Sequence, residues 1–198
     1  MDQVISKSII GHDFQRIVVD GVKRILESEA VKNRAQRLIV RGQQTAGNIF
    51  ATHNELANHL SKLIDGELRS FLNKFKYSTE GLIRYWPEEY HLNGWIVSMK
   101  SGGTINPHIH ENGWMSGSIY INVPESKGEH DGSLVVCIDE NVIGSKDQKF
   151  NAAQNILDVK TGSLCLFPSS LIHYTLPFTS PEDRIVLAFD VIPGRPNL

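Results

Sequence analysis

The chain has 198 residues, of which 40% are hydrophobic and 21% are charged, with a net charge of −2 and a pI of about 6.4. These values are typical of one globular domain with a substantial core and lack the basic footprint of a nucleic-acid binder. No apolar run approaches the ~20 residues that cross a membrane. The first residues also lack the basic and apolar regions of a signal peptide, so we expect a cytoplasmic protein that binds neither nucleic acid nor membrane.

The first third of the sequence has a helical pattern. Apolar side chains recur at mixed spacings of three and four between residues 13 and 38, and the polar stretch 41–48 predicts a linker. Thr52 and Glu55 have the spacing of a capping box, which predicts the start of a second helix. An apolar stripe follows, which predicts burial against a sheet, another helix or a partner protein. The stripe consists of Leu56, Leu60, Leu63, Ile64, Leu68, Phe71, Leu72 and Phe75.

After Lys76, short runs of β-prone residues alternate with turn signals. The predicted strands are 81–86, 94–99, 114–123, 133–138, 156–159, 163–167, 172–175 and 184–192. Eight short strands of this kind are typical of a sandwich or jelly roll, and the nearly continuous apolar run 185–189 predicts a central strand. We therefore expect one mainly β domain of the α+β type over residues 1–198. Residues 1–76 would be a helical support packed on one sheet, and residues 77–198 the jelly-roll catalytic core.

The two cysteines, Cys137 and Cys165, each lie in an apolar run. Two isolated cysteines provide no disulfide framework and no cysteine-based zinc pattern. We therefore interpret both as buried thiols that act as small hydrophobic residues.

The most informative motif is His108-Ile109-His110, which follows Pro107 and a pair of glycines. Side chains alternate along a strand, so both histidines can point to the same side with Cα atoms roughly 6.6 Å apart. Two imidazoles at this separation can bind one ion at about 2.0–2.1 Å. A third ligand from a distant strand, for which His173 is the candidate, would leave the other face of the ion open, as in a catalytic site. Taken alone, however, His173 could be an ordinary core or surface histidine.

Arg184 is a second clue. It follows His173 by eleven residues and begins a strongly apolar predicted strand. An arginine that points into a barrel is costly unless it meets an anion, and its planar guanidinium suits a carboxylate. The alternative is a salt bridge to Glu182 or Asp183 at the start of the strand.

These residues carry a resemblance to a family of 2-oxoglutarate- and iron(II)-dependent oxygenases. The segment 106–124, NPHIHENGWMSGSIYINVP, resembles the family's core motif. The segments 162–173, GSLCLFPSSLIH, and 182–185, EDRI, resemble the same family, so the likeness covers roughly residues 94–192. The resemblance implies a double-stranded β-helix, which is a jelly roll with the metal inside its open end.

The resemblance also implies roles for individual residues. His108 and His173 would bind the metal, whereas His110 stands where the wider superfamily usually has a carboxylate. The third protein ligand is therefore either His110 or absent. The neighbouring Glu111 should point to the other face of the strand unless the chain bulges there.

Arg184 would bind the distal carboxylate of 2-oxoglutarate by the same resemblance. The superfamily often has a hydroxyl residue two positions later, where this chain has Val186. Tyr120 or Tyr174 would then assist Arg184, although either could simply be a core tyrosine. Asp190 stands where the family often has an asparagine, and no role follows for it.

The function implied is that of a non-haem Fe(II) oxygenase that consumes 2-oxoglutarate and O2 and releases succinate and CO2. It would hydroxylate a peptide, an amino acid or another small molecule. Asn112, Trp114 and the loop 125–132 could line the mouth of the site. Four further residues could equally be structural or surface residues: Trp86, His91, Trp95 and His130.

Two other functions stay open. A cupin-like metalloenzyme that does not use 2-oxoglutarate would have a similar pair of histidines, but the glutamate expected three or four residues after His110 is missing, since Gly113 and Trp114 stand there. A jelly-roll binding module without a metal is the other. The sequence leaves the oligomeric state open, a homodimer included.

Overall fold

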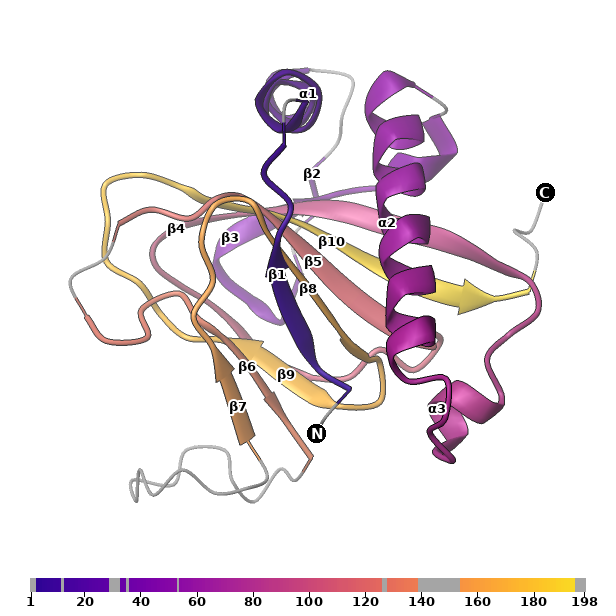
Figure 1. Cartoon of the computed structure of the whole chain (residues 1–198). Coiled ribbons are helices and arrows are strands. Elements are labelled where there is room, and N and C mark those ends of the chain that lie inside the picture. Colours follow the sequence, from indigo (N-terminus) through magenta and orange to yellow (C-terminus); the bar gives the residue numbers. More distant parts are fainter. Residues whose placement is uncertain are drawn as a thin grey trace.

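The structure is a computed structural model that describes residues 3–11, 13–28, 36–52, 54–125, 128–138 and 154–194, and the backbone of residues 33–34. It is a mainly β jelly roll with helices on one side (Figure 1). The strands are β1 (Ile5–Ser8), β2 (Asn33–Arg34), β3 (Ile39–Thr45), β4 (Tyr90–His108), β5 (Met115–Asn122), β6 (Leu134–Cys137), β7 (Gln154–Leu157), β8 (Ser163–Pro168), β9 (Ile172–Thr175) and β10 (Arg184–Pro193). A π-helical turn (Phe14–Val19) leads into α1 (Asp20–Glu27), and a 3-10 turn (Ile49–Thr52) precedes α2 (Glu55–Lys74) and α3 (Gly81–Arg84).

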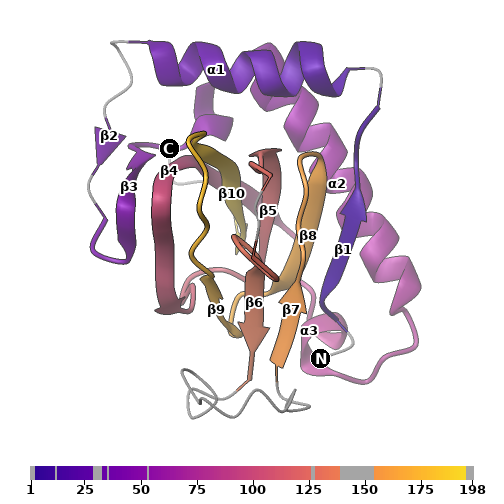
Figure 2. The same ribbon diagram turned by 90° about the vertical axis from the view of Figure 1, so that its left-hand side faces the viewer.

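The strands pair in the order β1-β8-β5-β10-β4-β9-β6-β7, and β3 pairs with both β2 and β4. The long strand β4 joins the two layers of the jelly roll, because its first part pairs with β10 and its last part pairs with β9. The larger layer consists of β1, β8, β5, β10 and the first part of β4. It lies between α2 on one side and β6, β7 and β9 on the other (Figures 1 and 2). This arrangement leaves an interior between the two layers, where the residues discussed below are found.

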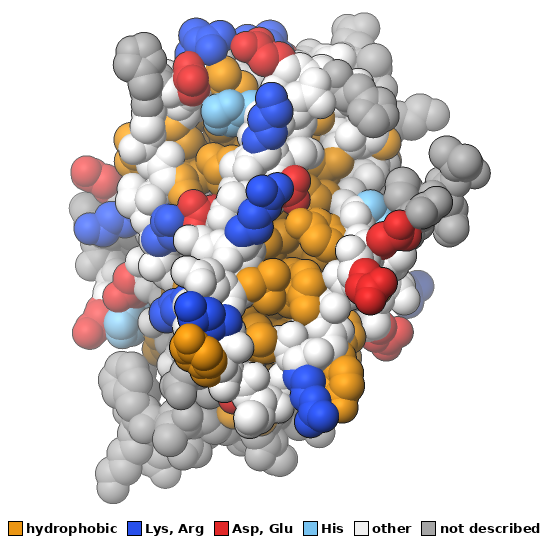
Figure 3. Space-filling model, turned by 45° about the vertical axis from the view of Figure 1, so that its right-hand side comes forward, with side chains coloured by type: hydrophobic (Ala, Val, Ile, Leu, Met, Phe, Trp, Pro, Cys, Tyr) orange, Lys and Arg blue, Asp and Glu red, His pale blue; other side chains and the backbone are white. Residues whose placement is uncertain are grey.

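The helix α2 covers the outer face of the larger layer, as its apolar stripe predicts. Leu60 and Ile64 are fully buried in a cluster with Ile96, Leu187 and Phe189 of the sheet. Figure 3, which brings the side of α2 and α3 forward, shows apolar side chains gathered in the middle of that face with charged side chains around them. Partly buried residues at the edge of this cluster are Leu63, Phe75, Leu82, Ile83, Trp86 and Tyr90.

The cap of α2 differs from the prediction. The N-cap is Asn54, whose side-chain oxygen accepts a hydrogen bond from the backbone N–H of Ala57 at 2.8 Å. Thr52 instead belongs to the preceding 3-10 turn, where its hydroxyl donates to the carbonyl of Ile49 at 2.7 Å. The prediction that Thr52 caps this helix was wrong, because Asn54, a better cap with extended backbone, stands two residues later.

The N-terminal third contains strands that the sequence pattern hides. The predicted helix over 13–38 ends at Glu27, and the predicted linker 41–48 overlaps β3. The first 76 residues also contribute β1, which pairs with β8 at the end of the sheet path. Most side chains of β1 and β3 are not buried, so these strands are held by backbone pairing and carry no apolar periodicity.

One predicted strand is a helix. Residues 81–86 have a β-prone composition, yet Gly81–Arg84 form the short helix α3, with the N–H of Arg84 bonded to the carbonyl of Glu80 at 3.0 Å. Composition cannot separate a short apolar strand from a helical turn. The other seven predicted strands correspond to β4 through β10, and β10 is central, between β5 and β4.

Two expectations from composition can be compared with the structure. Cys137 and Cys165 are buried and form no disulfide, which confirms their interpretation as buried thiols. No helix in the described part of the chain is long and apolar enough to cross a membrane.

The turn that precedes β6 is held by an ion pair between His130 and Asp158. His130 Nδ1 lies 2.7 Å from Asp158 Oδ1, and the hydroxyl of Ser133 donates to the same oxygen at 2.7 Å. The hydrogen bond between the two residues raises the pKa of His130 and lowers the pKa of Asp158.

Replacing His130 with asparagine is expected to lower the free energy of unfolding by a small, pH-dependent amount. Asparagine is chosen because it tolerates the backbone φ of +62° at this position. The raised histidine pKa stabilises the fold below the ordinary value of 6.5 and ceases to do so as the pH rises through the folded pKa. The lowered aspartate pKa stabilises it above 3.8 and ceases to do so as the pH falls. The loss should therefore be largest between about pH 4 and 6.5, and at most about 1 kcal/mol because both groups are solvent-screened. Urea unfolding from pH 4 to 9 measures it, and a pH-independent difference would contradict the assignment.

Candidate metal centre

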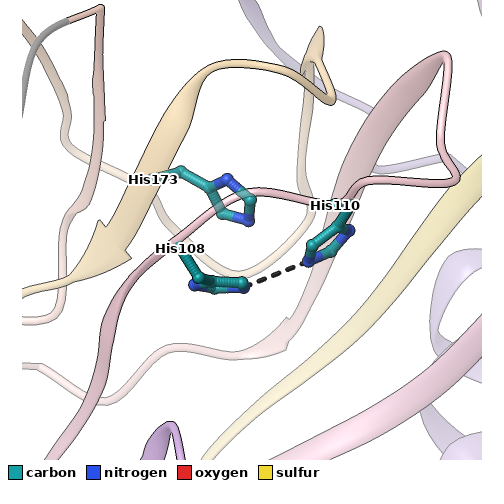
Figure 4. A group of neighbouring side chains, drawn as sticks. All are labelled: His108, His110 and His173. Carbon is teal, nitrogen blue, oxygen red and sulfur yellow. Dashed lines mark hydrogen bonds between the residues drawn. The ribbon is translucent and has the colours of Figure 1, made fainter.

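Three histidines converge inside one end of the jelly roll (Figure 4). His108 is the last residue of β4, His110 lies in the turn that leads to β5, and His173 lies on β9. The β4–β9 pairing places His108 directly opposite His173, and their ring centroids are 4.2 Å apart. One ligand atom from each of the three residues lies within 4.8 Å of the other two. The structure thus brings together the three histidines that the sequence singled out.

The local backbone differs from the expected continuous strand. β4 ends at His108, so His110 is directed by a turn and not by strand alternation. Its backbone N–H donates to the carbonyl of Ser169 at 3.1 Å, and its Nε2 comes within 3.1 Å of His108 Nε2. Glu111 is exposed and is not part of the cluster, so among the described residues His110 completes the set of three.

Each histidine ring forms a hydrogen bond through Nδ1, which leaves its Nε2 directed toward the other two rings. His108 Nδ1 donates to the carbonyl of Asn106 at 2.8 Å, and His173 Nδ1 donates to the carbonyl of Leu171 at 3.1 Å. Because a carbonyl oxygen only accepts, the Nδ1 atoms carry hydrogen and the Nε2 atoms keep their lone pairs. His110 Nδ1 lies 2.6 Å from Asp190 Oδ1, which gives the third ring the same orientation.

The environment keeps two of the rings neutral. Burial holds the pKa of His173 well below its usual value, and the neighbouring His108 lowers it further. Burial also lowers the pKa of His108. Neutral imidazoles are the form that binds metal ions, so protons compete weakly with a metal for these two rings at neutral pH.

Arg184 lies in the same cavity and has no anionic partner among the described residues. Its side chain is 1% exposed, and its Nε has no hydrogen-bond partner. The alternative of a salt bridge to a neighbouring carboxylate is not observed, since Asp183 pairs with Lys100 at 2.6 Å. A buried guanidinium without an anion is costly, so this orphaned donor fits a carboxylate-bearing ligand.

Of the two candidate tyrosines, Tyr120 lies beside Arg184. The guanidinium carbon of Arg184 is 5.1 Å from the centroid of the Tyr120 ring. Burial raises the pKa of Tyr120, so its hydroxyl keeps its hydrogen. Tyr174 follows His173 on β9 and therefore points to the opposite face of the strand, where its hydroxyl accepts a hydrogen bond from Gln154 at 3.3 Å.

A cavity of about 1190 Å³ connects these groups. Its lining includes the buried Arg184 and Tyr120, the three histidines, and a set of more exposed polar and aromatic side chains that we call the mouth. Its volume exceeds the ~300–1,000 Å³ of an ordinary ligand pocket, so it has room for two small molecules side by side. The mouth includes Gln44, His91, Asn93, Trp95 and Asn112.

The mouth differs in part from the one expected. Asn112 lines it, but the Trp114 indole donates to the carbonyl of Leu82 at 3.0 Å and packs on the helical side. None of the described residues of the loop 125–132 lines the cavity. Trp95 does, with its ring 5.6 Å from that of His110.

Sequence reasoning missed Asp190, Asn93 and Trp95. Asp190 lies at an even spacing from Arg184 on β10, so both side chains face the interior. That period-two signal was present in the sequence. Asn93 faces Asp190 in the β4–β10 pairing, which no local pattern predicts.

Comparisons with known proteins agree with this geometry. A family model described as "Putative 2OG-Fe(II) oxygenase" matches residues 93–190, which is about half of the chain. A sequence search of curated proteins gave no match.

Solved structures with the same fold include several oxygenases. A Pseudomonas putida prolyl-4-hydroxylase superposes with a TM-score of 0.64 at 15% identity, covering 98% of this chain and 94% of that one. A Trichoplax adhaerens prolyl hydroxylase in complex with a hypoxia inducible factor peptide fragment has a TM-score of 0.65 at 15% identity, with coverages of 97% and 84%. The epimerase SnoN from nogalamycin biosynthesis, described as non-heme and α-ketoglutarate dependent, has a TM-score of 0.65 at 7% identity, with coverages of 96% and 78%. At these identities the likeness shows the fold.

Proposed function

We propose, from the premise that this chain belongs to the family of 2OG-Fe(II) oxygenases, that it is a hydroxylase of a peptide, an amino acid or a small metabolite. It would use iron(II), 2-oxoglutarate and O2 and release succinate and CO2. The observation that carries the proposal is the presence of two complementary features in one cavity: a set of three histidines and a buried arginine whose Nε lacks a hydrogen-bond partner.

The three histidines fit an iron site. Imidazole nitrogens suit iron(II), as they also suit zinc, copper and nickel, and three ligands on one side leave other positions open. His108, His110 and His173 would hold the iron. When bound, the iron would supply the activation of O2, which the side chains of the protein cannot perform. The apolar residues around the site, such as Phe167 and Val186, would exclude bulk water.

Arg184 fits the distal carboxylate of 2-oxoglutarate. Its guanidinium would form two parallel charge-assisted hydrogen bonds with the carboxylate, which would satisfy the Nε that lacks a partner. The buried Tyr120 hydroxyl, which keeps its hydrogen, lies beside the guanidinium and would donate to the same carboxylate.

The mouth of the cavity favours a neutral or cationic substrate that carries amide groups. Its described lining contains the amides of Gln44, Asn93 and Asn112 and the ring of Trp95, whereas Glu111 is its one formally charged residue apart from Asp190 and Arg184 inside. Amide side chains can hydrogen-bond both the N–H and the C=O of a peptide. Phosphorylated substrates would find no lysine or arginine among the described mouth residues. The peptide bound by the Trichoplax enzyme supports this preference.

The proposal predicts turnover of 2-oxoglutarate even without the true substrate. We expect the protein, loaded anaerobically with iron(II), to form succinate slowly when 2-oxoglutarate and air are added. Omission of iron, or its replacement with zinc, should abolish succinate formation, because zinc has no redox chemistry. Mass spectrometry of peptides and amino acids added to the assay should then identify a substrate that gains one oxygen atom.

Two results would contradict the proposal in different ways. Metal binding without any retention of 2-oxoglutarate in an anaerobic titration would indicate a metalloenzyme of the cupin type. A purified protein that binds neither iron nor another divalent metal would indicate a binding module.

A further inference from the structure

Asp190 is a buried carboxylate that contacts one of the three histidines. It lies near the end of β10, is 6% exposed, and accepts a hydrogen bond from His110 Nδ1 at 2.6 Å. Among the described residues, His110 is the only ion-pair partner of Asp190. A buried carboxylate without a lysine or arginine is costly, so its position calls for a reason other than stability.

His110 needs an external partner that the other two histidines do not need. His108 and His173 each donate Nδ1–H to the carbonyl two residues earlier in the chain, which orients the ring locally. After His108 the strand ends, and His110 makes no such contact. Its ring orientation therefore depends on an acceptor brought in by the tertiary fold, from a residue 80 positions away.

Two buried serines hold the Asp190 carboxylate in place. The Ser116 hydroxyl donates to Asp190 Oδ1 at 2.7 Å, and Ser169 Oγ lies 2.8 Å from Ser116 Oγ. Because the single hydroxyl proton of Ser116 goes to Asp190, the Ser169 hydroxyl is the donor in the second contact. Ser116 is also the direct cross-strand partner of Asp190 in the β5–β10 pairing.

Gly113 keeps room for this chain of hydrogen bonds. A Cβ at Gly113 would collide with Ser169 Oγ and would approach the Asp190 carboxyl carbon to 3.4 Å. Gly113, Ser116, Ser169 and Asp190 come from three separate parts of the chain, yet all pack against His110 or against one another.

We propose that Asp190 is a positioning residue that makes His110 a metal ligand, with Ser116 and Ser169 as its support. The carboxylate accepts the Nδ1 hydrogen, which leaves the Nε2 lone pair directed at the point shared with His108 and His173. It also places a carboxylate behind the His110 ring, which makes His110 a more basic ligand. This inference rests on the proposed function, because it concerns the same metal site.

Cobalt(II) titration of the full chain tests the role of Asp190, since cobalt reports both affinity and coordination through its visible absorption. We expect Asp190→Ala to weaken cobalt binding about 10- to 100-fold, as is typical for an outer-sphere partner of a ligating histidine, and to change the visible spectrum. Asp190→Asn keeps an acceptor oxygen of the same size and should lose less affinity. Asp183→Ala, which removes a carboxylate paired with the exposed Lys100, is the matched control and should bind cobalt normally.

A double-mutant cycle separates positioning from general damage to the fold. If Asp190 acts through His110, adding Asp190→Ala to His110→Ala should cause no further loss of cobalt affinity. The inference would be overturned if Asp190→Ala lowered the cobalt affinity of His110→Ala as much as it lowers that of the wild type. Unchanged affinity and spectrum in Asp190→Ala alone would overturn it too. A wild-type protein that binds no cobalt would instead overturn the proposed function, so the two failures are distinguishable. Melting temperatures of all variants, measured without metal, identify any variant that is not folded.

Discussion

Replacing His173 with alanine is expected to abolish succinate formation and to weaken iron(II) binding by more than the 10- to 100-fold typical of an outer-sphere change. His173 is the most buried of the three histidines at 6% exposed, and it faces His108 across the β4–β9 pairing. Its loss removes one of three ligands, and no other described histidine, cysteine or carboxylate belongs to the cluster. Metal content after dialysis and an anaerobic iron titration measure the effect.

A histidine outside the cavity supplies the control for this experiment. His59 lies on α2 and is not among the cavity residues, so His59→Ala should bind iron as the wild type does. Equal iron content in the wild type and in His173→Ala would show that the metal, if any, binds elsewhere.

Replacing Arg184 with alanine is expected to remove 2-oxoglutarate binding while leaving the metal in place. Truncating one partner of a buried charged pair costs about 2–5 kcal/mol, which corresponds to about 30-fold to a few thousandfold in affinity. Arg184 is not part of the histidine cluster, so the three histidines should still bind metal. Calorimetric titration of the metal-loaded protein with 2-oxoglutarate measures the change.

Two further variants sharpen this prediction. Arg184→Lys keeps the charge but loses the planar pair of donors, so its affinity should fall between those of the wild type and Arg184→Ala. Lys100→Ala removes a cation near the start of β10 that pairs with Asp183 on the exposed side, and should bind 2-oxoglutarate normally. Unchanged binding in Arg184→Ala would refute the assigned carboxylate site.

The regular elements that can be predicted from the sequence are those whose own side chains are buried in a repeating pattern. α2 has a stripe at helical spacing, and β10 alternates between Leu187 and Phe189 on the helical side and Val186 on the cavity side. β3 could not be recognised, since it is glutamine- and glycine-containing, mostly unburied and held by backbone pairing with β4. α3 was misread because four residues are too short to show a period.

The candidate site divides in the same way. His108, His110, His173 and Arg184 are metal- or carboxylate-binding residue types at informative spacings, so the sequence alone was enough to select them as candidates. Neither Asp190 nor Trp95 stood out, because each gains its place only through a cross-strand neighbour. Between Tyr120 and Tyr174, the choice depended on which face of a strand each occupies and on what else lies there.

By itself, then, the sequence indicated a sandwich or jelly roll, the packing face of α2, and the candidate residues for binding a metal and a carboxylate. These properties follow from local periodicity and residue chemistry, which act over a few neighbouring positions. Only the tertiary structure decided that His110 completes the three histidines, that Asp190 hydrogen-bonds it, and that Arg184 has no anionic partner among the described residues. These features of the site depend on the register between strands that are far apart in the chain. A shift of one residue in that register would turn each side chain to the opposite face of its strand.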